Sequence, residues 1–243
     1  MDFDESFHSA PVRYALDEVD SDEELEDKIE PNTIQIMVSL PDTNLTLIFG
    51  LSGPGSIYID SLKGLTSIGT VKNRQETIAS ILQIPNQPIV FVSFTKQIEA
   101  NESVQYVRSI FEQCSQRLSK VIVLDSFTTE SDLIPPTLRV LQSSASPLVQ
   151  TLTLYEIPHM VTGLSAAIIN YCEIHSIPCY NLLTLQEYVY GKLLVTDTTL
   201  EAYNYGLHQL GHDHLKFDSE LLQKALESRH SGRIDDSHHR LYV

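Results

Sequence analysis

Short apolar runs separated by turn-forming residues follow residue 32. Apolar and polar side chains alternate from Thr33 to Leu40, which predicts a strand, and Leu45 to Phe49 and Ser56 to Asp60 have the composition of two more. The segment Pro41 to Asn44 has the chemistry of a tight turn. We therefore expect this region to begin the sheet with antiparallel strands.

The apolar pattern changes at Pro88. Pro88 to Phe94 is almost continuously apolar, as expected of a strand covered on both faces. The residues after it have apolar side chains at spacings of 3, 4, 3 and 4, namely Val104, Val107, Phe111, Cys114 and Leu118. This spacing predicts a helix of about 16 residues, with Asn101 as its cap. Val121 to Leu124 then predicts a second buried strand, which completes a right-handed βαβ crossover.

Helices and strands continue to alternate in the second half of the chain. Pro135 and Pro136 predict the start of a helix over Leu138 to Gln142, because proline is favoured in a first helical turn. The later elements are expected to be a strand at Leu152 to Tyr155, a helix from Leu164 to His175, a strand from Ile177 to Leu185, and helices near Leu200 to Leu210 and Ser219 to Ser228. This order predicts one α/β domain, an α/β/α sandwich with a mixed, mostly parallel sheet.

Charge divides the 243-residue chain into three parts. Residues 1–30 hold 12 acidic and 2 basic residues, and Asp17 to Asp27 places 8 carboxylates in 11 positions. Such a segment repels itself and has little apolar surface to bury, so we expect a disordered acidic arm over residues 1–31. The folded domain is expected over residues 32–228, and a polar stretch without periodicity predicts a flexible tail over residues 229–243.

Composition also excludes classes of partner. The whole chain has 16 basic and 32 acidic residues, a net charge of −16, which disfavours binding to nucleic acid or to anionic membranes. We find no apolar run of the 18 residues needed to cross a bilayer, and the first residues have the wrong charge for a secretory signal. Three cysteines cannot all pair with one another. A soluble intracellular protein with reduced thiols is the expectation.

Gly50 to Ser56 is the one glycine-rich segment that follows a predicted strand. Its glycines lie at offsets 0, 3 and 5, whereas a dinucleotide-binding loop has glycines at offsets 0, 2 and 5. The Gly-Lys-Ser/Thr of a Walker loop does not follow them either. Pro54 also removes a backbone donor. A hairpin turn is therefore a better interpretation than a phosphate-binding loop.

Two groups of residues have spacings that resemble metal sites. The histidines His208, His212 and His214 lie where a helix is expected to end, and we favour a polar helix terminus over a zinc site. Cys172, His175 and Cys179 surround the end of another helix, where packed thiols are the favoured interpretation. We predict no metal and no cofactor, with a metal-binding regulator based on the histidines as an alternative.

Evidence for catalysis is weak in the sequence. There is no Gly-x-Ser-x-Gly motif and no cysteine in a basic setting. Asp125 follows a predicted buried strand, at the sheet edge where α/β proteins hold ligands. We predict no enzymatic activity and no catalytic residues. The alternative hypothesis is an α/β enzyme of the nucleoside phosphorylase or hydrolase type, with a site near Asp125 and the Gly50 to Gly55 turn.

The chain ends in Leu241, Tyr242 and Val243, after a mainly polar stretch of twelve residues. Such a linker can carry an apolar, phenolic and anionic tip about 40 Å from the domain. We expect this tip to suit a partner pocket that has apolar walls and a lysine for the carboxylate.

Two segments of the second half resemble the proteasome assembly chaperone 1 family. Val161 to Pro178 has the family's Leu-x-Ala-Ala start and the Tyr-Cys turn that leads into Ile-Pro, and Pro135 to Leu141 resembles the helix start that precedes it. The hydrophobic-Tyr-any terminus agrees as well, so the resemblance covers about residues 135–243. This chain departs from mammalian members in having no tryptophan.

The resemblance implies a non-catalytic chaperone of the cytoplasm, and also of the nucleus. Members of the family form a heterodimer with proteasome assembly chaperone 2. The pair binds the α-subunit ring and promotes assembly of the 20S core particle. Leu241, Tyr242 and Val243 would then enter a pocket between adjacent α-subunits, where the terminal carboxylate meets a lysine.

Overall fold

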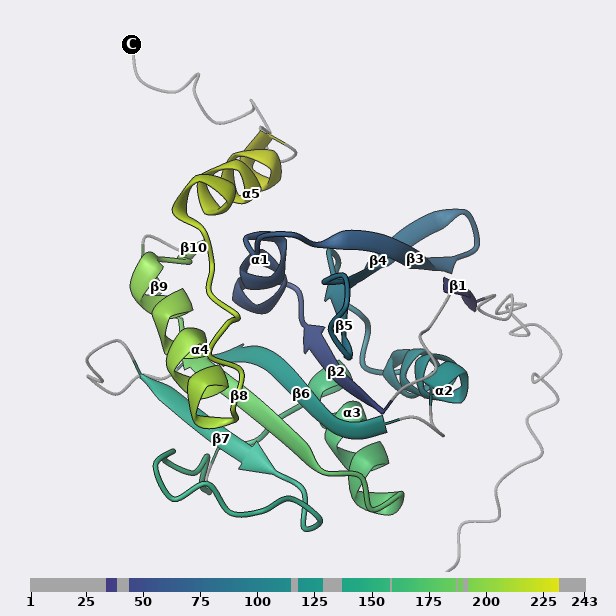
Figure 1. The fold of residues 1–243 in the computed structure, drawn as a ribbon, viewed down its shortest axis with the longest axis vertical. Coiled ribbons are helices and arrows are strands. Elements are labelled where there is room, and N and C mark those ends of the chain that lie inside the picture. The colour runs from purple at the N-terminus through teal and green to yellow at the C-terminus, as the bar shows by residue number, and fades with distance from the viewer. Residues whose placement is uncertain are drawn as a thin grey trace, which may run out of the picture. The chain divides into compact units, whose positions relative to one another are not determined.

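The structure is a computed structural model that describes residues 34–38, 44–114, 118–128, 137–157, 159–186, 188–189 and 192–231 (Figure 1). All of these residues belong to one unit, Thr33–Val243. For residues 188–189, 192–193 and 229–231 only the backbone is described. The expected acidic arm, and the tail beyond Ser231, lie outside the described residues.

An eight-stranded mixed sheet organises the domain. Its order is β1-β3-β4-β5-β2-β6-β8-β7. The strands are β1 (Ile34–Val38), β2 (Leu45–Gly50), β3 (Thr66–Asn73), β4 (Glu76–Gln83), β5 (Ile89–Phe94), β6 (Leu118–Phe127), β7 (Leu138–Gln142) and β8 (Cys179–Leu185), and a small ribbon pairs β9 (Tyr188–Val189) with β10 (Lys192–Leu193). The predicted α/β domain with a mixed sheet is confirmed. Parallel pairing is confined to the centre, where β5, β2, β6 and β8 are neighbours, so the sheet is less parallel than expected.

Five helices, found within the described residues, cover the two faces of the sheet. They are α1 (Pro54–Asp60), α2 (Ser103–Cys114), α3 (Gly163–Ile174), α4 (Asp197–Gln209) and α5 (Ser219–Ser231). Helices α2 and α3 pack together on one face, whereas α1 and α4 cover the other and α5 packs against α1 (Figure 1). The three-layer arrangement predicted from the sequence is therefore present.

Aromatic side chains fill the core on each face. On the α2 face, the ring of Phe49 lies 5.8 Å from that of Phe111, centre to centre. On the opposite face, Tyr58 and Tyr203 meet edge to face at 5.5 Å. The Tyr58 hydroxyl lies 2.8 Å from the carbonyl oxygen of Leu215, so this buried phenol has the polar partner that its burial requires.

The segment Ser56 to Asp60 was expected to be a strand and is instead the helix α1. Pro54 occupies the first turn, where its fixed φ favours a helix, and Gly53 has a φ of 111° that reverses the chain before it. The strand prediction failed because a short run that is buried all round carries no periodicity. The glycine-rich segment is consequently a strand-to-helix turn and not a hairpin turn.

Residues Leu138–Gln142 form strand β7, so the helix predicted after Pro135 and Pro136 was wrong. The strand pairs antiparallel with β8 and buries Val140 against it. Tertiary pairing outweighs local preference here, since five residues are too few for a stable helix. The strand expected at Leu152 to Tyr155 is reduced to a single bridge between Leu154 and Val140.

Strand β1 pairs antiparallel with β3 rather than with its neighbour in sequence, β2. The start of the sheet is thus antiparallel, but the partner strand was missed. The β3–β4 hairpin was also missed, because its strands are rich in serine, threonine and half-buried positions. At its turn, Arg74 has a φ of 57°, a value more typical of glycine or asparagine.

Most other predicted elements are confirmed, with shifts at their ends. The strand at β5 and the α3-to-β8 segment lie where expected. Helix α2 is shorter than predicted, because Leu118 already belongs to β6. Val104 lies in α2 but is 66% exposed, so it is not part of the buried stripe. Helix α5 continues to Ser231, three residues beyond its expected end. Among the described residues, no helix has the length and apolar character to cross a membrane.

Candidate functional site

A pocket of about 440 Å³ opens at the carboxyl ends of the central strands. The chain leaves β2 for α1 on one face of the sheet, and leaves β6, by way of β7, for α3 on the other face. Neighbouring strands whose connections diverge in this way leave a crevice between them, which is where α/β folds commonly hold ligands. The lining comes from Leu51, Ser52, Lys96–Ile98, Asp125–Thr128, Tyr155, Met160–Ser165, Leu183 and Gln186.

The two segments on which the enzyme hypothesis rested do meet at this pocket. Leu51 and Ser52, from the turn after β2, lie beside Asp125 of β6 in its wall. The N–H of Leu51 donates to the carbonyl oxygen of Leu124 at 3.0 Å, which joins the turn to the end of β6.

Asp125 is the acidic side chain of the pocket. One carboxylate oxygen accepts a hydrogen bond from the N–H of Ser126 at 2.8 Å, and the hydroxyl of Ser165 also donates to the carboxylate. Burial raises the pKa of Asp125, and these two hydrogen bonds oppose that rise. Ser165 in turn accepts a 2.6 Å hydrogen bond from the side-chain amide of Asn181, so its hydroxyl is oriented toward Asp125.

The elements around Asp125 hold the pocket wall in place. Ser126 donates through its hydroxyl to Oε1 of Gln186 at 2.8 Å, and the Gln186 backbone N–H donates to the carbonyl oxygen of Phe127 at 2.9 Å. From the opposite side of the sheet, the Tyr203 hydroxyl donates to the backbone carbonyl of Asp125. The polar groups of the pocket are therefore positioned by β6, β8 and α4 before any ligand is present. This arrangement can bind, and the described lining residues include no histidine and no cysteine that could act as a base or a nucleophile.

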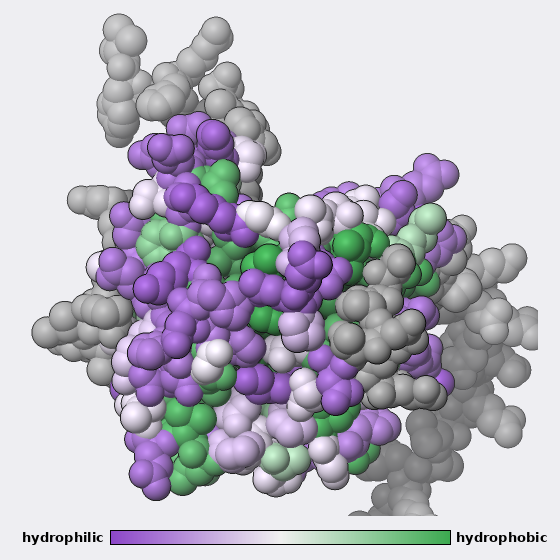
Figure 2. Space-filling view, in the orientation of Figure 1, coloured by the Kyte–Doolittle hydropathy of each residue, from purple (hydrophilic) through white to green (hydrophobic). Residues whose placement is uncertain are grey.

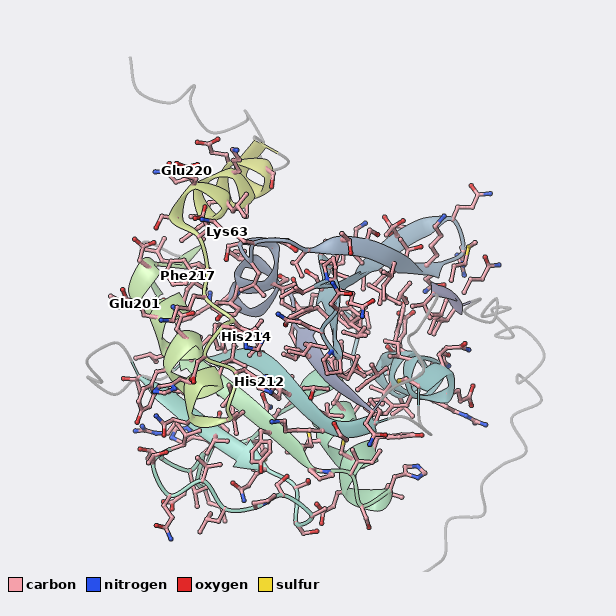
Figure 3. All side chains as sticks on the ribbon, in the orientation of Figure 1. Lys63, Glu201, His212, His214, Phe217 and Glu220 are labelled. Carbon is pink, nitrogen blue, oxygen red and sulfur yellow. The ribbon has the colours of Figure 1, made fainter. Side chains whose placement is uncertain are left out.

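The three histidines at the end of α4 do not converge. His208 is exposed and pairs with Asp213 through Nδ1. His212 is buried, with its ring 6.1 Å from that of His214, and both lie beside the last turn of α4 (Figure 3). Burial is the main cause that lowers the pKa of His212 to about 4, with smaller effects from Lys120 and His214. In the part of the chain that the structure describes, no group of three or more metal-ligating side chains is assembled.

The cysteine residues are packed as apolar side chains. Cys114, Cys172 and Cys179 are all buried and free, and the thiols of Cys172 and Cys179 are hydrogen-bonded to each other. His175 does not join them, since its ring stacks on Tyr171 with 4.1 Å between centres. Burial raises the pKa of Cys114 to about 12, which is the opposite of what a reactive thiol needs.

Large apolar side chains are exposed in the segment that follows β7. Leu154, Ile157 and Met160, which we call the apolar loop, are 40%, 95% and 80% exposed. The sequence gives no sign of this feature, because apolar residues without periodicity do not reveal that they face solvent. The face of the molecule seen in Figure 2 is mainly hydrophilic with scattered apolar patches.

The predicted partner-binding residues Leu241, Tyr242 and Val243 lie outside the described residues. The structure does describe how α5, which precedes them, is attached to the domain. Asp218 caps α5 by accepting from the N–H of Leu221 at 3.1 Å, and it pairs with Lys63 at 2.7 Å (Figure 3). Phe217 packs its ring against Tyr58 of α1.

Comparisons with known proteins find the same fold in several solved structures. The protein of unknown function from Thermoplasma acidophilum is similar in structure, with a TM-score of 0.63 at 10% identity over 78% of this chain and 84% of that one. Pyrococcus furiosus PbaB, an archaeal proteasome activator, has a TM-score of 0.60 and 12% identity, with 83% of this chain and 98% of that one covered. PbaA from the same organism, an archaeal homolog of proteasome-assembly chaperone, has a TM-score of 0.58 and 14% identity, with 82% of this chain and 94% of that one covered. No curated protein matches the sequence.

The identities to these structures are low, so they establish the fold alone. A family model, PAC1, described as proteasome assembly chaperone 4, matches residues 62–243, about three quarters of the chain. The chain therefore belongs to the proteasome assembly chaperone family, whose members are non-enzymatic. The match begins well before residue 135, so it includes the parallel strands β5 and β6 as well as the segments that carried the resemblance, although β2 precedes it.

Proposed function

We propose that this protein forms a heterodimer with a chaperone of the proteasome assembly chaperone 2 type, and that the pair binds the α-subunit ring during assembly of the 20S core particle. The observation that carries the proposal is the family match over residues 62–243, which spans most of the folded domain. The family implies action on the proteasome in the cytoplasm and nucleus. The enzyme alternative loses its basis, because the family is non-enzymatic.

In this proposal, Leu241, Tyr242 and Val243 bind the ring. Their apolar, phenolic and carboxylate groups suit a pocket with apolar walls and a cation. A tail of three anchoring residues binds weakly by itself. Two tails on one heterodimer gain from effective concentration, so the pair can select neighbouring α-subunits held at the correct spacing.

The sister chaperone, in the same proposal, contacts the apolar loop. Protein interfaces bury apolar side chains at their centre, and methionine is enriched there. Ile157 is almost fully exposed, and Leu154 and Met160 are exposed near it in the sequence, so several apolar side chains face solvent in one segment, as they do at interaction sites. The loop follows β7, at the edge of the sheet opposite β1.

Affinity purification of the tagged full chain from its own cells tests the proposed function. We expect α-subunits and one sister chaperone of the same family to be recovered. The Ile157→Asp variant should lose the sister chaperone. Met37→Asp is the matched control, because Met37 is also an exposed apolar residue, 66% exposed, but lies on β1. Recovery of neither α-subunits nor a sister chaperone would contradict the proposal.

A further inference from the structure

The pocket at the ends of β2 and β6 lies beside the apolar loop, since Met160 is part of its lining, but the proposed chaperone function gives its interior no role. Exposed residues such as Ser52 and Lys96 line its mouth, whereas Leu51, Leu164 and Leu183 are buried and out of reach of a docking protein surface. Its volume of about 440 Å³ falls in the range of small-molecule sites. The chemistry of the lining therefore needs its own explanation.

The carboxylate of Asp125 determines which ligands can enter. Ionised carboxylates accept about four hydrogen bonds, and Asp125 receives donors from the Ser126 N–H and the Ser165 hydroxyl. Asp125 is also one of the residues that line the pocket. A ligand that occupies the pocket must then supply N–H or O–H donors, and an anionic group beside Asp125 would be repelled.

The neighbouring groups favour a neutral donor over a cation. The hydroxyl protons of Ser126 and Ser165 are already donated, to Gln186 and to Asp125, so these side chains offer acceptor lone pairs and the ligand must supply further donors. A hydroxyl group supplies a donor without adding a charge. Lys96 is a further lining residue, and its positive charge disfavours a cationic ligand although it pairs with Glu76.

Apolar side chains complete the wall. Leu51, Leu164 and Leu183 are buried residues that line the same pocket as the polar groups. A ligand with hydroxyls on one edge and C–H groups on its face would satisfy both kinds of surface. Sugar rings have this arrangement.

We propose that the pocket binds a neutral small molecule with a vicinal diol, either a free sugar or the ribose of a nucleoside, with the two hydroxyls on the carboxylate of Asp125. The diol donates one hydrogen bond to each carboxylate oxygen, and the carboxylate keeps its hydrogen bonds from the Ser126 N–H and the Ser165 hydroxyl. The site shares Met160 with the apolar loop, and its other lining residues take no part in the contacts proposed above.

Isothermal titration calorimetry of the full chain tests this inference. The probes are adenosine, 2′-deoxyadenosine, D-ribose and D-glucose, each up to millimolar concentration. We expect adenosine or one of the sugars to bind. If adenosine binds, 2′-deoxyadenosine should bind at least about tenfold more weakly, because the site would be left with an unpaired polar group. Binding by adenosine alone assigns the site to nucleosides, and binding by the free sugars assigns it to sugars.

Two variants locate the binding. Asp125→Asn should lower the affinity for the probe that binds at least about tenfold. Ser52 is exposed at the pocket, so Ser52→Trp should block it without disturbing the core, and Ser67→Trp, on exposed β3, is its matched control. Failure of every diol probe to bind, equal binding of adenosine and 2′-deoxyadenosine, or unchanged binding by the Ser52→Trp variant would each overturn the inference.

Discussion

Gly55 lies directly against the carbonyl group of Leu124: a Cβ atom at Gly55 would be 2.0 Å from that oxygen. This close approach seats the first turn of α1 on the end of β6. It also brings the turn after β2 beside Asp125, which forms one wall of the pocket. Only glycine can occupy such a position without moving the backbone.

We predict that Gly55→Ala lowers the free energy of unfolding by about 3 kcal/mol, because the added methyl group must displace a backbone carbonyl. Urea denaturation measures the loss. Gly206→Ala is the control, since its Cβ would meet the ends of the Leu138 and Leu182 side chains, which can shift. Its loss should be about 1 kcal/mol. Equal losses in the two variants would contradict the proposed role of Gly55.

Stability should depend on pH through His212. Burial lowers the pKa of His212 to about 4 in the folded state, from its ordinary value of 6.5. The unfolded chain therefore binds more protons between these values, and stability falls as the pH drops from about 6.5 to about 4, then levels off. Protonation of His212 should lower the free energy of unfolding by about 2 kcal/mol over this range, a figure reduced because the ring retains contact with solvent.

Urea titrations between pH 4 and 7.5 on the wild-type chain and the His212→Gln variant measure this contribution. The difference in stability between the two proteins should change across that window. His208→Gln is the control, because His208 is exposed and its replacement should leave the wild-type profile unchanged. A His212→Gln profile parallel to wild type would show that His212 is not the group responsible.

None of the three cysteines should react with a thiol reagent in the native state. All three are buried, and burial raises the pKa of Cys114, whereas the pKa of Cys179 is raised first by its hydrogen bond with Cys172 and then by burial. Because thiolate is the reactive form, labelling must await unfolding. We expect no labelled thiol in native buffer and three in guanidinium, measured by mass spectrometry. Rapid native labelling of any cysteine would contradict the packing described here.

The sequence predicted the fold where periodicity or continuous burial was clear. The α2 stripe, the β5 run and the α3-to-β8 segment were located within a few residues. It failed at Ser56 to Asp60 and at Leu138 to Gln142, where about five residues buried by tertiary contacts give too little pattern to separate helix from strand. The β3–β4 hairpin was missed because half-buried strands rich in serine and threonine resemble loops.

The site was only partly predictable. Asp125 was placed at the correct sheet edge by the strand that precedes it, and the structure confirms that it meets the turn after β2. The contribution of Ser165 and Gln186 could not be foreseen, because they reach the pocket from α3 and from the end of β8. Long-range pairing of strands decides such contacts, and a single sequence does not reveal it.

The affinity of the protein for isolated α-rings is the most direct test of the central claim. Full-length chain, a chain that lacks Leu241 to Val243, and a L241Y/Y242L double variant of unchanged composition would be compared, each bound to the same sister chaperone. We predict that truncation and exchange both weaken binding at least about tenfold, with unchanged unfolding midpoints, because the anchoring groups are lost or misplaced. Equal affinities for all three proteins would contradict the claim that this tripeptide binds the ring.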